Sequence, residues 1–281
     1  MVGSFGKKRK GAYNPNRVNA LDSGVAYIAV LAVFALASFG LQYVPTEFFR
    51  EIYEYDVYLY LIVNTLFSQF LIFAVALVYS LIRKSNPFSG GGFVAKKDAV
   101  HSLSAVILTA GIMMTFYYVH LQFGSDVTTF TGSTDFPFEE NLSELAFVYA
   151  FLYVILSALL PAVFEEMLFR GIIMRGLEQY GKVFAVVVSS LMFALMHGNF
   201  EQLILQFIGG LAIGTVVMLT GNFVLGSLMH FFNNFFAMIF AAMINPLEST
   251  AFGIYRATVA DAASIVIGIA FLIFGVLYFG S

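Results

Sequence analysis

Apolar residues form long runs along almost the whole chain, and short polar segments separate these runs. A helix that spans a membrane needs about 20 mostly apolar residues. By this measure the sequence predicts an all-α, polytopic integral membrane bundle of about eight transmembrane helices. The predicted spans are residues 25–44, 57–82, 102–121, 144–170, 183–197, 203–220, 223–244 and 262–279.

The composition agrees with this pattern. The chain is 60% hydrophobic and only 11% charged, whereas about a quarter of the residues in a soluble domain are charged. The chain has no cysteine, which excludes disulfides, thiolate metal sites and a cysteine nucleophile. A basic cluster, Lys7-Lys8-Arg9-Lys10, precedes the first span. No basic folded domain follows it, so we interpret it as a topology or lipid signal and expect no nucleic-acid partner.

The distribution of basic residues predicts the orientation. With the N-terminus in the cytoplasm and eight spans, 12 of the 14 Lys and Arg residues lie on the cytoplasmic side, and only Arg50 and Arg256 lie outside. This asymmetry satisfies the positive-inside rule. The sequence therefore predicts that both termini are cytoplasmic.

Two adjacent glutamates lie in the fourth apolar run. Glu165 and Glu166 follow an apolar stretch that begins at Leu145, and Arg170 comes four residues after Glu166. Charged groups at membrane depth are costly and usually serve a function. The i,i+4 spacing predicts an ion pair between Glu166 and Arg170. Glu165 points about 100° away around the helix, so we expect it to lie apart from the cation and to serve as a general base.

A predicted tight turn near Gly181 brings a histidine toward these glutamates. Glu165 lies 16 residues before Gly181, and His197 lies 16 residues after it. If both helices run unbroken to the turn, each residue is roughly 24 Å from it. A plain helical hairpin therefore predicts that Glu165 and His197 lie at the same depth.

A second hairpin is predicted around Gly221-Asn222. His230 and Asn234 lie four residues apart in the helix that follows, so they share a face. In the preceding helix, Gly210 and Gly214 form a small-xxx-small pair, which we interpret as a close packing contact.

Three motifs in order carry a family resemblance: Glu165-Glu166-Met-Leu-Phe-Arg170 is EExxxR, Phe193-Ala-Leu-Met-His197 is FxxxH, and His230-Phe-Phe-Asn-Asn234 is HxxxN. Over about residues 145–244 the chain resembles the CAAX protease and bacteriocin-processing (CPBP, or Abi) family of intramembrane proteases. These proteins are relatives of the Ras-converting CAAX prenyl endopeptidase.

The resemblance implies hydrolysis of peptide bonds in a membrane cavity that opens to the cytosol. It implies that Glu165, assisted by His197, activates water. His230 and Asn234 would donate hydrogen bonds to the developing oxyanion. Glu166 and Arg170 would support the site, and Phe193 belongs to the second motif.

The resemblance leaves the metal open. A glutamate and two histidines plus water could hold a single divalent metal such as zinc, yet a metal-free mechanism with glutamate-activated water is equally compatible with the motifs. We favour glutamate catalysis without an obligatory metal, and we expect no organic cofactor.

The predicted organisation has four parts: a basic cytoplasmic tail (1–24), N-terminal helices and loops (25–144), a catalytic core (145–244), and a loop with the last span (245–281). The expected partners are membrane lipid and a peptide or lipidated protein substrate, such as a lipidated tail, a pheromone or a bacteriocin leader. The family's breadth favours a multi-pass protein of a bacterial cell membrane. The sequence leaves the oligomeric state open.

Other functions fit parts of the pattern. A proton-coupled transporter could use the Glu/His cluster as a relay, although no internal repeat is evident. A non-catalytic immunity or scaffold protein could keep the fold without the reaction. Ser157, Ser189 and Ser190 are possible nucleophiles, but serines in membrane helices commonly bond backbone carbonyls.

Overall fold

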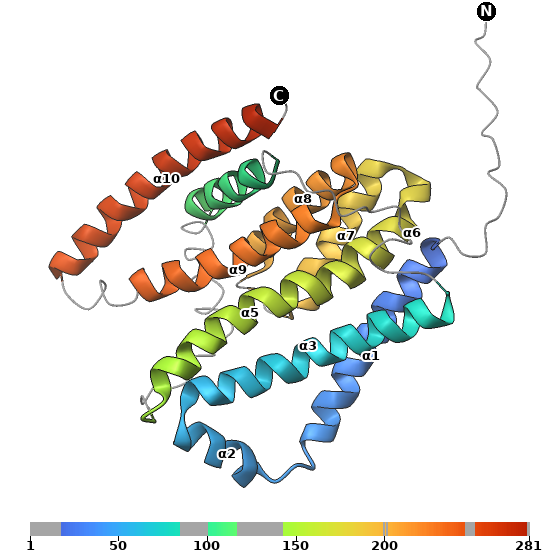
Figure 1. Cartoon of the computed structure of the whole chain (residues 1–281), viewed down its shortest axis with the longest axis horizontal. Coiled ribbons are helices and arrows are strands. Elements are labelled where there is room, and N and C mark those ends of the chain that lie inside the picture. Colours follow the sequence, from blue (N-terminus) through green and yellow to red (C-terminus); the bar gives the residue numbers. More distant parts are fainter. Residues whose placement is uncertain are drawn as a thin grey trace, which may run out of the picture.

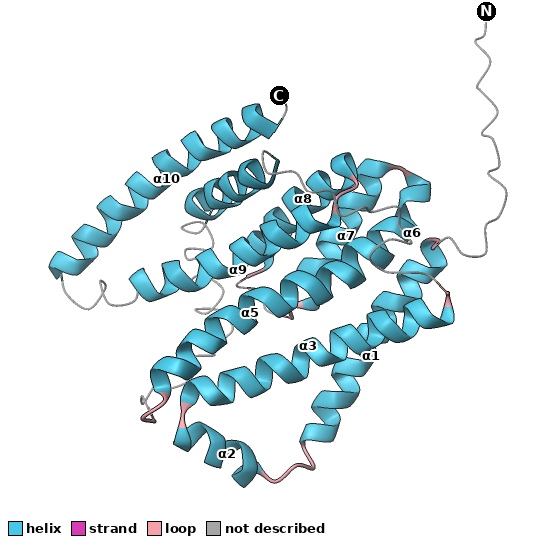
Figure 2. Ribbon diagram, in the orientation of Figure 1, coloured by secondary structure: helices cyan, strands magenta, loops and turns pink. Residues whose placement is uncertain are grey.

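The computed structural model describes residues 18–84, 101–116, 143–198, 200, 202–244 and 251–279. These residues form helices joined by short turns and contain no strand (Figure 2), which confirms the all-α class. The helices are α1 (Ala20–Leu41), α2 (Thr46–Tyr55), α3 (Val57–Ile82), the helix His101–Phe116, α5 (Ala146–Leu168), the π-helix η1 (Phe169–Met174), α6 (Arg175–Leu177), the 3₁₀-helix η2 (Glu178–Tyr180), α7 (Lys182–Met196), α8 (Leu203–Thr220), α9 (Phe223–Ile244) and α10 (Ala251–Phe279).

Four helical segments of the described chain are long and apolar enough to cross a membrane. They are α1, α3, the continuous stretch Ala146–Tyr180 and α8. Shorter apolar helical stretches of 10 to 17 residues occupy the other four predicted spans. The structure thus supports a membrane protein, while eight spans and cytoplasmic termini stay predictions. Most of the basic tail lies outside the described residues.

Two helix boundaries differ from the prediction because polar groups are satisfied locally. α1 begins at Ala20 rather than residue 25, since Asn19 and Asp22 form a reciprocal capping box at its start. The fourth helix does not end at Arg170. It continues through η1, α6 and η2 to Tyr180, because the charges of its polar segment are paired inside the bundle.

The helix α2 was not predicted from the sequence. It is short, and its charged residues give it no apolar run long enough to resemble a span. It connects the end of α1 to the start of α3 (Figure 1).

The stretch from α5 to η1 is the centre of the bundle. α5 packs against α3 on one side and α9 on the other, and α7 packs against α8. Gly181 (φ 116°) and Gly221 (φ 64°) form the two turns that the sequence predicted, and both adopt backbone conformations that favour glycine. A Cβ on Gly210 would lie 3.1 Å from Ser190 Cβ, which confirms the close approach of α7 and α8.

The start of α1 holds the π-helical segment in place. The Ser23 hydroxyl donates a 2.8 Å hydrogen bond to the carbonyl of Ile173, within η1. Gly176 lies against Ser23 and the carbonyl of Asn19, so closely that a Cβ there would collide with both. The helix α1 therefore supports the π-helical turn after the two glutamates, although the two segments lie far apart in the sequence.

Asp56 joins the first residues of α3 to the segment before α5. Its carboxylate accepts hydrogen bonds from the backbone N–H of Tyr58 and Leu59 and from both the N–H and the hydroxyl of Ser143. Burial alone would raise the pKa of this carboxyl group. The hydrogen bonds from Ser143, Leu59 and Tyr58 outweigh burial and hold the pKa below its ordinary value.

We predict that Asp56→Asn lowers the free energy of unfolding at neutral pH by about 1–3 kcal/mol, the usual cost of an unsatisfied buried polar group. The amide keeps the N-cap acceptor Oδ1, but it puts an NH₂ group, which cannot accept, where Oδ2 binds the N–H and the hydroxyl of Ser143. Because the folded-state pKa is lowered, the stabilisation is present above the unfolded pKa of about 3.9 and is lost as the pH falls through the folded value. Melting curves of the wild type and the variant in detergent, recorded from neutral to acidic pH, should therefore converge at low pH. A difference that stays constant with pH would contradict this role.

Candidate active site

The two glutamates lie at the buried end of α5, where the helix changes to π-helical geometry. Glu165 is 4% exposed and Glu166 is fully buried. Arg170 lies within the π-helical turn, and its side chain is also buried. π-Helical turns inside α-helices frequently occur at functional sites.

Glu166 is the acceptor at the centre of the cluster. Its Oε1 accepts hydrogen bonds of 2.8 Å from Arg170 Nη1 and of 2.8 Å from His230 Nδ1. Because Glu166 Oε1 accepts from the Arg170 guanidinium, we assign it as the acceptor from His230 as well. The Nδ1 atom of His230 therefore carries the proton and is the donor. Arg170 Nη2 also donates to the carbonyl of Gly210 at 3.0 Å, and the Phe193 ring lies 5.0 Å from the guanidinium carbon. The structure thereby confirms the predicted ion pair between Glu166 and Arg170.

Glu165 faces a different set of groups. Its Oε1 accepts a 2.8 Å hydrogen bond from Gln69 Nε2 on α3, and both side chains are buried. Its Oε2 lies 3.7 Å from His230 Nε2 and accepts no hydrogen bond from the described residues. The imidazole of His230 therefore lies between the two carboxylates, with one ring nitrogen toward each.

The cluster holds two acidic groups and one fixed cation. Glu166 pairs with Arg170, whereas the group beside Glu165 Oε2 is the imidazole of His230, with Nε2 3.7 Å away. A buried charge without a partner is strongly unfavourable. His230 and Gln69 are therefore the polar groups on which Glu165 depends.

His197 lies at the end of α7 and is half-buried. Its Nδ1 lies 2.9 Å from the carbonyl oxygen of Phe193, which can only accept, so the proton is on Nδ1 and Nε2 is left as an acceptor. Phe193 packs edge-on against both histidines, with ring centroids 4.8 Å from His197 and 5.5 Å from His230. Phe193 thus fixes the spacing between the two imidazoles.

The equal-depth prediction for Glu165 and His197 assumed two unbroken α-helices. The structure does not meet that assumption, because π-helical and 3₁₀ turns lie between Glu165 and Gly181. Within the described part of the chain, no hydrogen bond or ion pair joins His197 to either glutamate. The histidine that contacts both of them is His230.

Asn234 lies four residues after His230 on α9, and its amide is oriented by its neighbour. Asn233 Nδ2 lies 3.4 Å from Asn234 Oδ1, so the Asn234 carbonyl is the acceptor and its NH₂ group is left to donate elsewhere. Asn233 is buried against Gly209 of α8, where a Cβ would lie 3.3 Å from Asn233 Oδ1. The close contact between α8 and α9 therefore holds Asn233, and Asn233 in turn orients the amide of Asn234.

The described residues do not form a ready metal site. No group of three or more His, Asp or Glu side chains among them has the arrangement to hold a metal ion. The reason is geometric, since His230 directs its two nitrogens toward different carboxylates. The guanidinium of Arg170 also lies against Glu166, where it would oppose a second cation.

Two residues of this arrangement were missed as site residues in the sequence. Gln69 lies on α3, and nothing in its local sequence points to Glu165. Asn233 carried a weak signal, because it adjoins the last residue of the HxxxN motif. The catalytic roles of Glu165, His197, His230 and Asn234 stay predictions.

Residues 147–236 match the family model described as type II CAAX prenyl endopeptidase Rce1-like. The match covers less than half of the chain, but it contains all three motifs, and it confirms the family resemblance. Comparisons with curated proteins and with solved structures gave no match.

We predict that Arg170→Met destabilises the protein by about 3–5 kcal/mol, because it leaves Glu166 buried without its cation. A matched control is Arg175→Met, since Arg175 forms a 2.8 Å ion pair with Glu178 that is partly exposed, and such pairs contribute about 0–1 kcal/mol. Thermal unfolding in detergent measures both variants. Equal loss of stability would contradict a central role for the Arg170 pair.

Proposed function

We propose, from the premise that residues 147–236 form an Rce1-like domain, that the chain is an intramembrane endopeptidase in which a glutamate activates water. The observation that carries the proposal is the pair of buried carboxylates with distinct partners. Each carboxylate keeps its Oε2 without a hydrogen bond from the described residues. Glu166 is paired with the Arg170 cation and His230 through Oε1, and its Oε2 lies against Gly226, where a Cβ would be 3.4 Å away. Glu165 is bound instead by the neutral amide of Gln69, and its Oε2 lies 3.7 Å from His230 Nε2.

Glu165 is the general base in this mechanism. Its Oε2 is the acceptor for a proton of the attacking water, while Gln69 holds Oε1 and so fixes the plane of the carboxylate. His197 presents Nε2 as a second acceptor that can orient the water. The water oxygen forms a bond to the substrate carbonyl carbon as its proton passes to Glu165, and that proton later goes to the leaving amine.

Donors on α9 stabilise the negative oxygen that forms. The proposed donors are His230, with a proton on each ring nitrogen, and the NH₂ group of Asn234; both side chains are held in place before the substrate binds. Glu166 holds His230 through Nδ1, and Asn233 holds Asn234. Glu166 and Asn233 are thus positioning residues rather than groups that contact substrate.

The proposed substrates are lipidated or small peptides, because the reacting groups lie in a bundle of apolar helices that a membrane-anchored tail can approach from the bilayer. The proposed location is a bacterial cell membrane. The reaction as written uses only side chains of this chain and requires no bound metal.

We predict that Glu165→Gln lowers kcat/KM by about 10²–10⁴-fold, the usual contribution of a general base. The assay uses the purified protein and internally quenched peptides, one with a farnesylated cysteine and one without a lipid. Glu178→Gln is the matched control, because Glu178 lies in η2 and pairs with Arg175. Full activity of a folded Glu165→Gln variant would exclude Glu165 as the base.

We predict that Gln69→Leu lowers kcat by roughly 10- to 150-fold, since a hydrogen bond to a charged group contributes about 1.5–3 kcal/mol. KM should change little, because Gln69 holds the Glu165 carboxylate and is not proposed to contact substrate. The neighbouring Ser68→Ala variant, which removes only a bond to the Thr65 carbonyl, is the control. A rise in KM with kcat unchanged, or a loss of kcat that Ser68→Ala reproduces, would contradict a positioning role for Gln69.

We predict that 1,10-phenanthroline leaves kcat/KM unchanged at concentrations that inactivate a zinc protease treated in parallel. The same quenched peptides provide the measurement. Inhibition that added zinc reverses would replace the glutamate mechanism with a metal-dependent one.

A further inference from the structure

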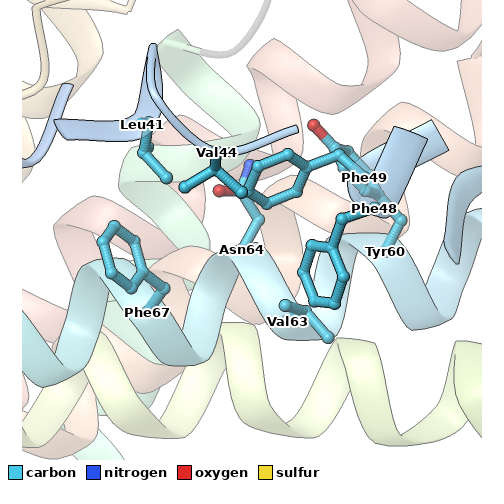
Figure 3. Close-up of a pocket in the computed structure, with 8 residues that line it drawn as sticks. All are labelled: Leu41, Val44, Phe48, Phe49, Tyr60, Val63, Asn64 and Phe67. Atoms are coloured by element: carbon cyan, nitrogen blue, oxygen red, sulfur yellow. The ribbon is translucent and has the colours of Figure 1, made fainter. Parts of the chain in front are cut away.

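A cavity lies on the other side of α3 from the glutamates. It has a volume of about 490 Å³, is partly open, and is formed by the end of α1, the linker after it, α2 and α3 (Figure 3). Leu41 and Val44 come from the α1 side, Phe48 and Phe49 from α2, and Phe67 from α3. This volume is within the range of sites that bind small molecules, about 300–1,000 Å³.

One amide interrupts this apolar lining. Asn64 projects from α3 toward the α1–α2 side of the cavity (Figure 3), and it is exposed. No hydrogen bond joins its side chain to any of the described residues. The amide is therefore available to form a hydrogen bond with a polar group that enters the otherwise hydrocarbon-lined cavity.

The cavity lies at the end of α1, the point where a helix that crosses a bilayer would reach the headgroups. Val44 belongs to the linker where the chain leaves α1, a helix long enough to span a membrane. α2 follows directly and is amphipathic, with Phe49 and Tyr53 half-buried and the charged residues exposed. Such helices lie in the plane of the membrane interface. The ester linkages of lipids occur at this level.

The exposed charges of α2 indicate the kind of headgroup. Arg50 pairs loosely with Glu54 at 3.6 Å, and Glu47 and Glu51 are also exposed. A headgroup with both a phosphate and an ammonium group complements such a mixed surface. An anionic headgroup would meet more acidic than basic side chains.

We propose that this cavity binds one acyl chain of a zwitterionic glycerophospholipid, whose ester carbonyl accepts a hydrogen bond from the Asn64 amide. A second copy of the chain fits less well. Helices that pair in membranes use small residues to approach closely, whereas bulky side chains such as Phe48, Val63 and Phe67 line this surface. The site is separate from the proposed active site, because Gln69 directs its side chain from α3 to α5.

The test uses the full chain in phosphatidylglycerol vesicles with a trace of phosphatidylethanolamine that carries a diazirine near one acyl terminus. After photolysis, mass spectrometry should locate the label in residues of the cavity. Val63→Trp fills the cavity and should reduce that labelling about fivefold or more. Phe70→Trp is the matched control, because Phe70 is an exposed residue of the same helix that does not line the cavity.

The proposed hydrogen bond from Asn64 is tested by comparing lipid probes whose acyl chains are joined by ester or by ether bonds. The wild type should prefer an ester-linked probe over its ether-linked analogue, and Asn64→Leu should remove this preference. Label spread evenly over lipid-facing residues, or equal labelling of wild type and Val63→Trp, would overturn the proposal. A dimer in detergent that Val63→Trp dissociates and Phe70→Trp does not would also overturn it, in favour of a dimer interface.

Discussion

A buried guanidinium imposes the main constraint on this protein. Arg170 lies within an apolar bundle, and its charge requires an anion at contact distance. Glu166 supplies that anion, and the same Glu166 oxygen accepts from His230 on α9. Arg170 also donates to the Gly210 carbonyl on α8. One ion pair therefore fixes the relative positions of three helices, and the groups proposed for catalysis depend on it.

The neighbouring glutamates differ because their surroundings differ. Glu166 faces the Arg170 cation and the His230 imidazole, so its Oε1 is already used as a hydrogen-bond acceptor. Glu165 faces the amide of Gln69 and the second nitrogen of the same imidazole. α3 supplies Gln69 and α1 supports the π-helical turn through Ser23, although both helices lie outside the segment that matches the family. The N-terminal helices thus contribute to the geometry of the site.

Local spacing predicted much of this arrangement. The Glu166–Arg170 pair follows from i,i+4 geometry, and the turns at Gly181 and Gly221 follow from glycine in short polar segments. Contacts between distant segments could not be predicted, since nothing near Gln69 in the sequence identifies Glu165 as its partner. The π-helical turn was also missed, because it depends on tertiary contacts such as the Ser23 bond to Ile173. Counting residues from Gly181 compared only the two helices of that hairpin, so it could not identify His230, which lies beside Glu165 on α9.

The central claim is that Glu165 drives the addition of water to a peptide bond. The most direct measurement compares peptides from native membranes that contain the wild type or Glu165→Ala, incubated in H₂¹⁸O. The account predicts new C-termini that carry ¹⁸O only in membranes with the wild type, and their sequences would identify the substrates. Identical sets of labelled peptide ends in both membranes would contradict it.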